Sequence, residues 1–147
     1  GAGRNQGIQE NQAVVCQNGL VGRVTSVGAT WAKVTALIDP EFSASVMVER
    51  TRDNGMVRGI LALGSDAAAT LELYYLPAGS DLVPGDTIVT NGYGGVFPKG
   101  ITVGIVTEVT RQAGGDGSRN ALVAPSADFL RLEEVMVIVA SSSQELQ

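Results

Sequence analysis

The segment Trp31–Ile38, WAKVTALI, alternates between two kinds of side chain. Ala32, Val34, Ala36 and Ile38 are all apolar, whereas the residues between them are mixed. Successive side chains of a strand point to opposite faces, whereas a helix repeats every 3.6 residues. One wholly apolar face at period two therefore predicts a half-buried β-strand over this segment.

Short apolar segments of the same kind recur along the rest of the chain, separated by turn signals such as Asn18-Gly19, Asn54-Gly55 and Asn91-Gly92. Many short strands with frequent turns predict an all-β sandwich or barrel. Helix is expected to be minimal, limited to short turns at Ser126–Glu134 and Asp66–Thr70. The other predicted strand segments are Ala13–Cys16, Leu20–Val27, Ala44–Arg50, Val57–Leu63, Thr70–Leu76, Thr87–Thr90, Ile101–Thr110, Asn120–Ala124 and Val135–Ala140.

Two stretches, Val21–Val27 and Val103–Val109, share the pattern V-G-x-V-T-x-V, and each follows an apolar segment that ends in Asn-Gly. This repetition favours two small, related β-barrel lobes packed together over a chance recurrence in a chain rich in Val and Gly. We expect a first lobe at residues 8–80, a second lobe at residues 81–140 and a polar C-terminal tail at residues 141–147. The alternative is that the middle strands are inserted into a discontinuous barrel.

Histidine is absent from the 147 residues, and Cys16 is the only cysteine. The usual general base is therefore missing, and a tetrahedral Cys/His zinc site cannot be built within one chain. We predict that the protein is not an enzyme and has no catalytic, cofactor-binding or metal-binding residues. The formal net charge of −5 argues against nonspecific binding to nucleic acid, because that affinity comes from cationic side chains that neutralise phosphates.

The glycine-rich stretch Asn91–Gly100, NGYGGVFPKG, is the most unusual part of the sequence. It lacks the G-x-x-x-x-G-K-[ST] spacing of a phosphate-binding loop, and no helical pattern follows it. A tightly folded connection that presents aromatic side chains at the surface is the physical alternative. We name as candidate partner-binding residues Tyr74, Tyr75, Tyr93 and Phe97, while burial of all four in the core remains an open interpretation.

A series of motifs, in this order, resembles one known family. It comprises Gly19–Val24, Asp39-Pro40, Val57–Leu61, Leu73–Pro77, Pro84–Gly92, Gly94–Gly100 (GGVFPKG), Ile101–Val106 and Pro125–Val139 (PSADFLRLEEVMVIV). In combination, these motifs resemble the extracytoplasmic β region of the rod shape-determining MreC family, from about residue 7 onward. Asn91-Gly92-Tyr93 stands where the family more often has Ser-Gly-Leu, and the 111–119 loop is idiosyncratic.

The resemblance implies two small β-barrels, similar in shape to those of chymotrypsin-like proteases but without their catalytic residues. It also implies a structural signature, in which the glycines permit turns or close strand approach. The signature residues are Gly19, Gly22, Asp39, Pro40, Gly59, Gly85, Asp86, Gly92, Gly94, Gly95, Phe97, Pro98, Gly100 and Gly104.

By the same resemblance, we expect a non-catalytic scaffold of the bacterial cell-elongation complex that maintains cell shape by binding and activating the peptidoglycan synthesis machinery. The implied partners are a class B penicillin-binding protein, MreD, RodA and, indirectly, MreB. The implied location is the extracytoplasmic face of the cytoplasmic membrane, and the family's single-pass anchor and coiled coil are absent from these 147 residues. We expect homo-oligomers through that coiled coil, with weak β contacts in addition.

Two other classes remain as alternatives at this point. One is a β-barrel adaptor of a membrane export complex, which would normally show a lipoyl-like hairpin and long helical flanks. The other is a carbohydrate-binding module acting on the cell wall. Exposed aromatic platforms are expected of that class, and aromatic residues are only 5% here, with Trp31 the sole tryptophan.

Overall fold

The computed structural model describes residues 2–60, 70–111, 119–129, 131–132 and 134–138. Within these residues the regular secondary structure is β-strand apart from one short 3₁₀ helix, η1 (Arg4–Gln6), so the predicted all-β class is confirmed. No helix in the described part of the chain is long and apolar enough to cross a membrane. The strands are β1 (Ala13–Cys16), β2 (Gly19–Val27), β3 (Ala32–Ala36), β4 (Ser43–Val48), β5 (Asn54–Ile60), β6 (Thr70–Tyr74), β7 (Thr87–Thr90), β8 (Thr102–Arg111), β9 (Arg119–Pro125) and β10 (Met136–Val137).

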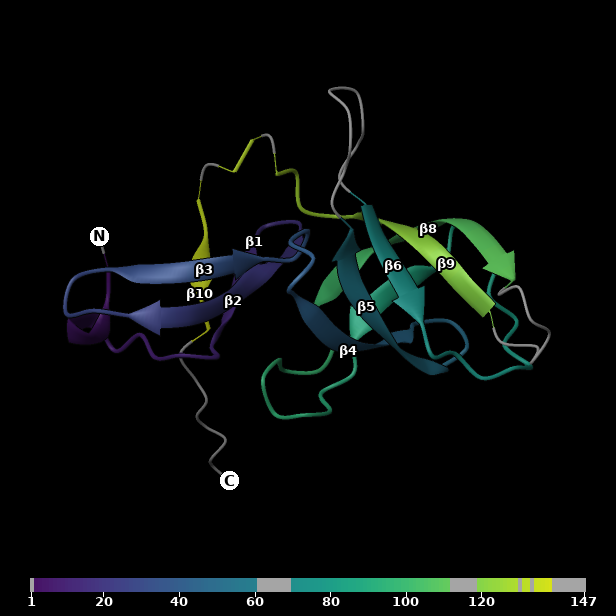
Figure 1. The fold of residues 1–147 in the computed structure, drawn as a ribbon, viewed down its shortest axis with the longest axis horizontal. Coiled ribbons are helices and arrows are strands. Elements are labelled where there is room, and N and C mark those ends of the chain that lie inside the picture. The colour runs from purple at the N-terminus through teal and green to yellow at the C-terminus, as the bar shows by residue number, and fades with distance from the viewer. Residues whose placement is uncertain (1, 61–69, 112–118, 130, 133, 139–147) are drawn as a thin grey trace.

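Six strands form a closed barrel in the order β4-β5-β6-β9-β8-β7 (Figure 1). All the neighbours are antiparallel, and the pairing of β4 with β7, Val46 opposite Thr90, closes the ring. Closure leaves no strand edge unpaired, which is the usual way in which an antiparallel sheet satisfies its backbone hydrogen bonds.

The remaining strands form a four-stranded sheet in the order β10-β1-β2-β3, which lies at one end of the barrel (Figure 1). The short strand β10 comes from the end of the described chain and pairs with β1, with Val14 opposite Val137. We call this unit the small sheet.

The expected lobe boundary between residues 80 and 81 does not follow the strand pairing. Strands from both sides of it, β4–β6 and β7–β9, share one barrel, and β10 returns to the small sheet. If β4, β5 and β6 formed a sheet of their own, the outer edges of β4 and β6 would be unpaired. Pairing with β7 and β9 satisfies the backbone hydrogen bonds of both edges. The small sheet, rather than the barrel, is therefore the discontinuous unit. The expected tail at 141–147 lies outside the described residues.

Two local expectations need correction. Among the described residues of Ser126–Glu134 there are bends and a turn but no helix, and residues 66–69 of the other expected helical turn lie outside the description. Asn54-Gly55 was expected to form a hairpin turn, but it begins strand β5. The turn before it runs through residues 49–53, where Arg52 adopts a φ of 67°.

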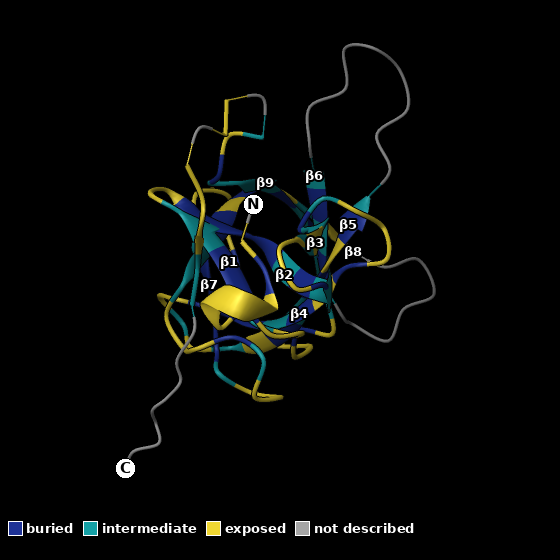
Figure 2. Ribbon diagram, turned by 90° about the vertical axis from the view of Figure 1, so that its left-hand side faces the viewer, coloured by how far each residue is buried: buried dark blue, intermediate teal, exposed yellow. Residues whose placement is uncertain are grey.

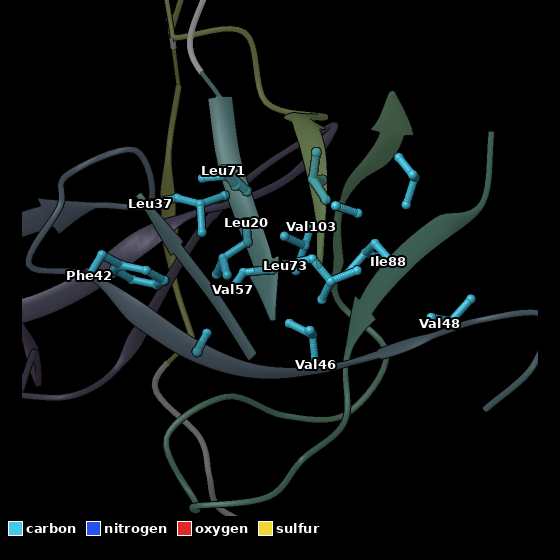
Figure 3. Packing of buried hydrophobic residues seen from close by; sticks show 14 of the residues in the cluster. Leu20, Leu37, Phe42, Val46, Val48, Val57, Leu71, Leu73, Ile88 and Val103 are labelled. Carbon is cyan, nitrogen blue, oxygen red and sulfur yellow. The ribbon is translucent and has the colours of Figure 1, made fainter. Parts of the chain in front are cut away.

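Alternation along the small sheet divides its side chains between two clusters. Ala13, Leu20 and Leu37 join the core of the barrel, and Figure 3 shows Leu20 and Leu37 beside barrel residues such as Val57. The opposite face carries a smaller cluster of Ile8, Val14, Val21, Val24 and Ala127. In Figure 2 the buried residues run along the strands, and the exposed ones lie mainly in the connections. The small sheet is therefore attached to the barrel through a shared apolar core.

The signature glycines occupy two kinds of position. Positive φ values occur at Gly19, Gly85, Gly92, Gly94, Gly95 and Gly100. Close backbone approach occurs at Gly22, Gly59 and Gly104, where a Cβ atom would overlap the backbone of another strand or connection. At Gly104 that backbone belongs to Ala124 of β9, so a side chain there would push the two paired strands apart.

Candidate partner-binding surface

The described residues include no group of three or more Asp, Glu, Cys or His side chains placed to hold a metal ion. The sole cysteine, Cys16, is half-buried and lines a groove of about 640 Å³ between the β1–β2 turn and residues 128, 131–132 and 134–136. The pKa values of the Arg50 and Arg58 guanidinium groups are raised, and the pKa of the Asp86 carboxyl group is lowered. Each of these groups is held in an ion pair, so the shifts are explained by structural contacts.

The signature residue Asp86 anchors the turn before β7. Its carboxylate accepts hydrogen bonds from Nε and Nη2 of Arg50 at 2.8 and 2.9 Å and from the backbone N–H of Val83 at 3.0 Å. Asp86 is only 6% exposed, whereas Asp81, which also pairs with Arg50 at 3.3 Å, is 81% exposed. The hydrogen bonds from Arg50, opposed by burial, lower the pKa of Asp86 below its usual value.

We expect Asp86→Ala to lower the free energy of unfolding by about 2 kcal/mol, because it leaves the Val83 N–H without its acceptor and breaks a charge-assisted pair. For a chain of this size that corresponds to a thermal midpoint lower by roughly 4–8 °C. The matched control is Asp81→Ala, which removes an exposed partner of the same arginine and should change the midpoint little. Equal effects of the two variants in thermal unfolding would contradict this assignment.

The same pair gives the stability a pH dependence. Because the pKa of Asp86 is lower in the folded chain than in the unfolded chain, its contribution is present above about pH 4 and is lost as the pH falls further. The difference in midpoint between wild type and Asp86→Ala should therefore be full at pH 6 and shrink as the pH falls below about 4. A difference that stays constant down to pH 2 would contradict the lowered pKa.

The glycine-rich connection from Asn91 to Gly100 joins β7 to β8 and is held at both ends by buried polar side chains. The Asn91 amide donates to the Val46 carbonyl at 2.9 Å and to Oδ1 of Asn54 at 3.0 Å, and its own Oδ1 accepts the Tyr93 N–H at 2.9 Å. At the other end, the Thr90 hydroxyl donates to the Pro98 carbonyl at 2.6 Å and accepts the Ile101 N–H at 2.9 Å. The backbone of this loop is therefore preorganised.

The two aromatic residues of this loop have opposite environments. Phe97 is buried in the barrel core, with its ring centroid 5.7 Å from that of Phe42. Tyr93 is 63% exposed. The prediction that Phe97 belongs to a surface patch is therefore wrong, since its side chain anchors the loop from inside. Tyr93 is left as an exposed aromatic group on a rigid loop.

The adjacent tyrosines lie at the end of strand β6, of which Tyr74 is the last residue. Tyr74 is half-buried, whereas Tyr75 is 78% exposed and adopts a φ of 64°, a conformation that bulky residues rarely take. Their rings pack edge to face with centroids 4.7 Å apart. The guanidinium of Arg58 lies 4.7 Å from the centroid of the Tyr74 ring and also pairs with Glu72.

The residues Arg58 and Glu72 were not among the predicted site residues. They lie directly opposite each other on β5 and β6, two positions from the pair Met56 and Tyr74, so the four side chains share the outer face of the barrel. Knowledge of the strand register would have identified them, but the sequence alone does not supply the register. The exposed candidates for partner binding are therefore Tyr93 on the β7–β8 connection and Tyr75 directly after β6, where Tyr74 and Arg58 support it.

Comparisons with known proteins point to one family. Residues 1–139 match the family model "Rod shape-determining protein MreC, barrel core". The cell shape-determining protein MreC of Listeria monocytogenes is 32% identical over 141 residues, which cover 95% of this chain and 47% of that protein. The chain thus spans about half the length of this relative.

Solved structures have the same fold. The crystal structure of MreC from Pseudomonas aeruginosa matches with a TM-score of 0.82 and 30% identity, covering 93% of this chain and 84% of that one. The major periplasmic domain from the cell shape-determining filament MreC matches with a TM-score of 0.71 and 29% identity, covering 86% and 75%. A complex between the penicillin-binding protein PBP2 and MreC from Helicobacter pylori matches with a TM-score of 0.69 over 88% and 79%, and at 18% identity this likeness shows the fold alone.

Proposed function

This chain belongs to the rod shape-determining MreC family, and from that premise we propose that it is a non-catalytic, extracytoplasmic scaffold that binds a class B penicillin-binding protein. In this role it maintains cell shape by favouring an active arrangement of the peptidoglycan synthase. The complex of PBP2 with an MreC protein from Helicobacter pylori supports the class of partner, and the periplasmic MreC domain among the structural neighbours supports the location. The family match also favours this function over an export adaptor or a carbohydrate-binding module.

The observation that carries the proposal is Tyr93, an exposed aromatic group on a loop whose ends are held by Asn91 and Thr90. Binding orders the side chains and loops at an interface, and a loop that is already ordered avoids much of this cost. Tyrosine is enriched among the residues that dominate binding energy. A rigid scaffold that presents a few aromatic anchors needs no titrating group, which agrees with a sequence that lacks histidine.

The other partners of the proposed complex are MreD, RodA and, indirectly, MreB, together with further copies of the chain. In the natural protein we attribute the main contact between copies to a coiled coil, and we attribute a weaker contact to the β-structure. The description of the periplasmic MreC neighbour as part of a filament supports self-association in this family.

The test is the affinity of this chain for the purified extracytoplasmic part of a class B penicillin-binding protein, measured by calorimetry. Tyr93→Ala is expected to weaken binding by roughly ten- to a hundredfold, as for a central interface anchor, with an unchanged thermal midpoint. Tyr75→Ala tests the second exposed tyrosine in the same way. The matched control is Val83→Ala, which shortens an apolar side chain that is 45% exposed elsewhere on the barrel.

Two results would count against the proposal. No binding of the wild-type chain at high micromolar concentration would refute this partner for the region. Normal binding by both tyrosine variants would refute the assigned surface.

A further inference from the structure

The small sheet ends at an open edge. The barrel is closed, whereas the order β10-β1-β2-β3 leaves β3 with a neighbour on one side only within the described residues (Figure 1). An unpaired edge presents free N–H and C=O groups to any other strand. Strand β3, Ala32–Ala36, contains no proline, and Lys33 is its only charged residue.

The hydrogen bonds at the two ends of β3 show which backbone groups face outward. The Gly28 N–H donates to the Trp31 carbonyl at 2.8 Å, and the Leu37 N–H donates to the Val21 carbonyl at 2.7 Å. Residues 31 and 37 therefore direct their backbone groups toward β2, and alternation gives residues 33 and 35 the same direction. The N–H and C=O groups of Ala32 and Val34 consequently point away from the sheet.

Two apolar side chains beside this edge are partly exposed. Val34, at the centre of the strand, is 38% exposed, and Trp31, just before it, is 54% exposed. Exposed apolar groups next to free backbone groups are what strand pairing between chains requires.

We propose that β3 pairs antiparallel with β3 of a second copy of this chain, across a two-fold axis through Val34. In this register Val34 lies opposite Val34, Ala32 opposite Ala36, and Lys33 opposite Thr35 of the second copy. The two copies of the small sheet then form one continuous sheet. This inference deepens the self-association proposed above and does not depend on the synthase as partner.

The register follows from charge and length. Centring the axis on Lys33 would place two lysines directly opposite each other, which is destabilising. Centring it on Thr35 would pair Ala32 with residue 38, beyond the end of the strand. Only the axis through Val34 pairs all five residues of β3 with one another, and it brings no like charges together.

The self-complementarity of this register identifies the occupant as a second copy. A two-fold interface requires that one patch match itself, and the row Ala-Lys-Val-Thr-Ala does so, with apolar residues opposite apolar residues and each lysine opposite a threonine. Five paired residues bury far less than the roughly 1,200 Å² of a stable interface. We therefore expect separate molecules to associate weakly, and copies that are held together to pair much more completely.

The first test uses two proline variants and sedimentation at high protein concentration. Val34→Pro removes an N–H that faces the second copy, so self-association should weaken by roughly tenfold or more while the thermal midpoint changes little. Thr35→Pro is the matched control, because it removes an N–H that faces β2 and should lower the midpoint clearly. Val34→Pro associating like wild type, or melting as low as Thr35→Pro, overturns the proposal.

The second test reads the register directly in a Cys16→Ser background. The register places Lys33 and Thr35 of different copies as a close, non-hydrogen-bonded pair, which suits a disulfide. A mixture of Lys33→Cys and Thr35→Cys chains should cross-link to heterodimers on mild oxidation, and neither variant alone should do so. The proposal is overturned if either cysteine variant alone cross-links as well as the mixture does, or if the mixture does not cross-link. Synthase binding should be unchanged in Val34→Pro, which separates this surface from the partner-binding one.

Discussion

Phe97→Ala is expected to lower the free energy of unfolding by about 3–5 kcal/mol, the usual cost of removing a buried phenylalanine side chain. Phe97 is 6% exposed, packs against Phe42 of the barrel core and holds the Asn91–Gly100 loop from inside. The lost contacts and the cavity left behind both contribute. For a chain of this size, the thermal midpoint should fall by roughly 6–20 °C.

The control for this prediction lies in the same loop. Tyr93→Ala removes an aromatic ring of similar size that is 63% exposed, and it should leave the midpoint nearly unchanged. Chemical denaturation of both variants measures the difference. A small loss of stability in Phe97→Ala would mean that the ring does not anchor the loop.

Gly59→Ala is expected to cost about 3 kcal/mol, at the upper end of the usual range for overpacking. A Cβ atom at Gly59 would overlap the Asp39 carbonyl group and the carbonyl carbon of Ile38. These atoms belong to the backbone that leads from β3 of the small sheet to β4 of the barrel, so no flexible side chain can move aside. The substitution should push the small sheet away from strand β5.

The matched control is Gly79→Ala, because a Cβ atom there would meet nothing within 4 Å. We expect its thermal midpoint to lie within a degree or two of wild type, whereas that of Gly59→Ala should fall by roughly 6–12 °C. Similar midpoints for the two variants would show that the connection can move away from Gly59 at little cost.

The all-β class and most of the strands were predictable from the sequence, because alternation and turn residues act over a few neighbouring positions. The period-two pattern of residues 31–38 correctly located strand β3 but not its more buried face, since Leu37 of the mixed set is fully buried whereas Val34 of the apolar set is 38% exposed. Asn54-Gly55 shows where such local patterns fail. The pair is compatible with a turn, but the backbone pairs Gly55 with Val46 of β4 instead.

The candidate surface was predictable only in part. Tyr93 and Phe97 stand in one glycine-rich loop and look alike in sequence, yet one is exposed and the other is buried. The difference depends on Phe42, which is distant in the chain and fills the core beside Phe97. The pairing of Arg58 with Glu72 likewise depends on the register of β5 and β6.

Short strands, tight turns, the absence of histidine and the motifs of one family can all be recognised in the amino-acid sequence. Which strand lies beside which is a property of the folded chain. Hydrogen bonds between strands join backbone groups that every residue carries, so the choice of partner is set by the packing of side chains from distant segments. For that reason the closed barrel, the discontinuous small sheet, the Arg50–Asp86 pair and the open edge at β3 emerge only from the folded chain.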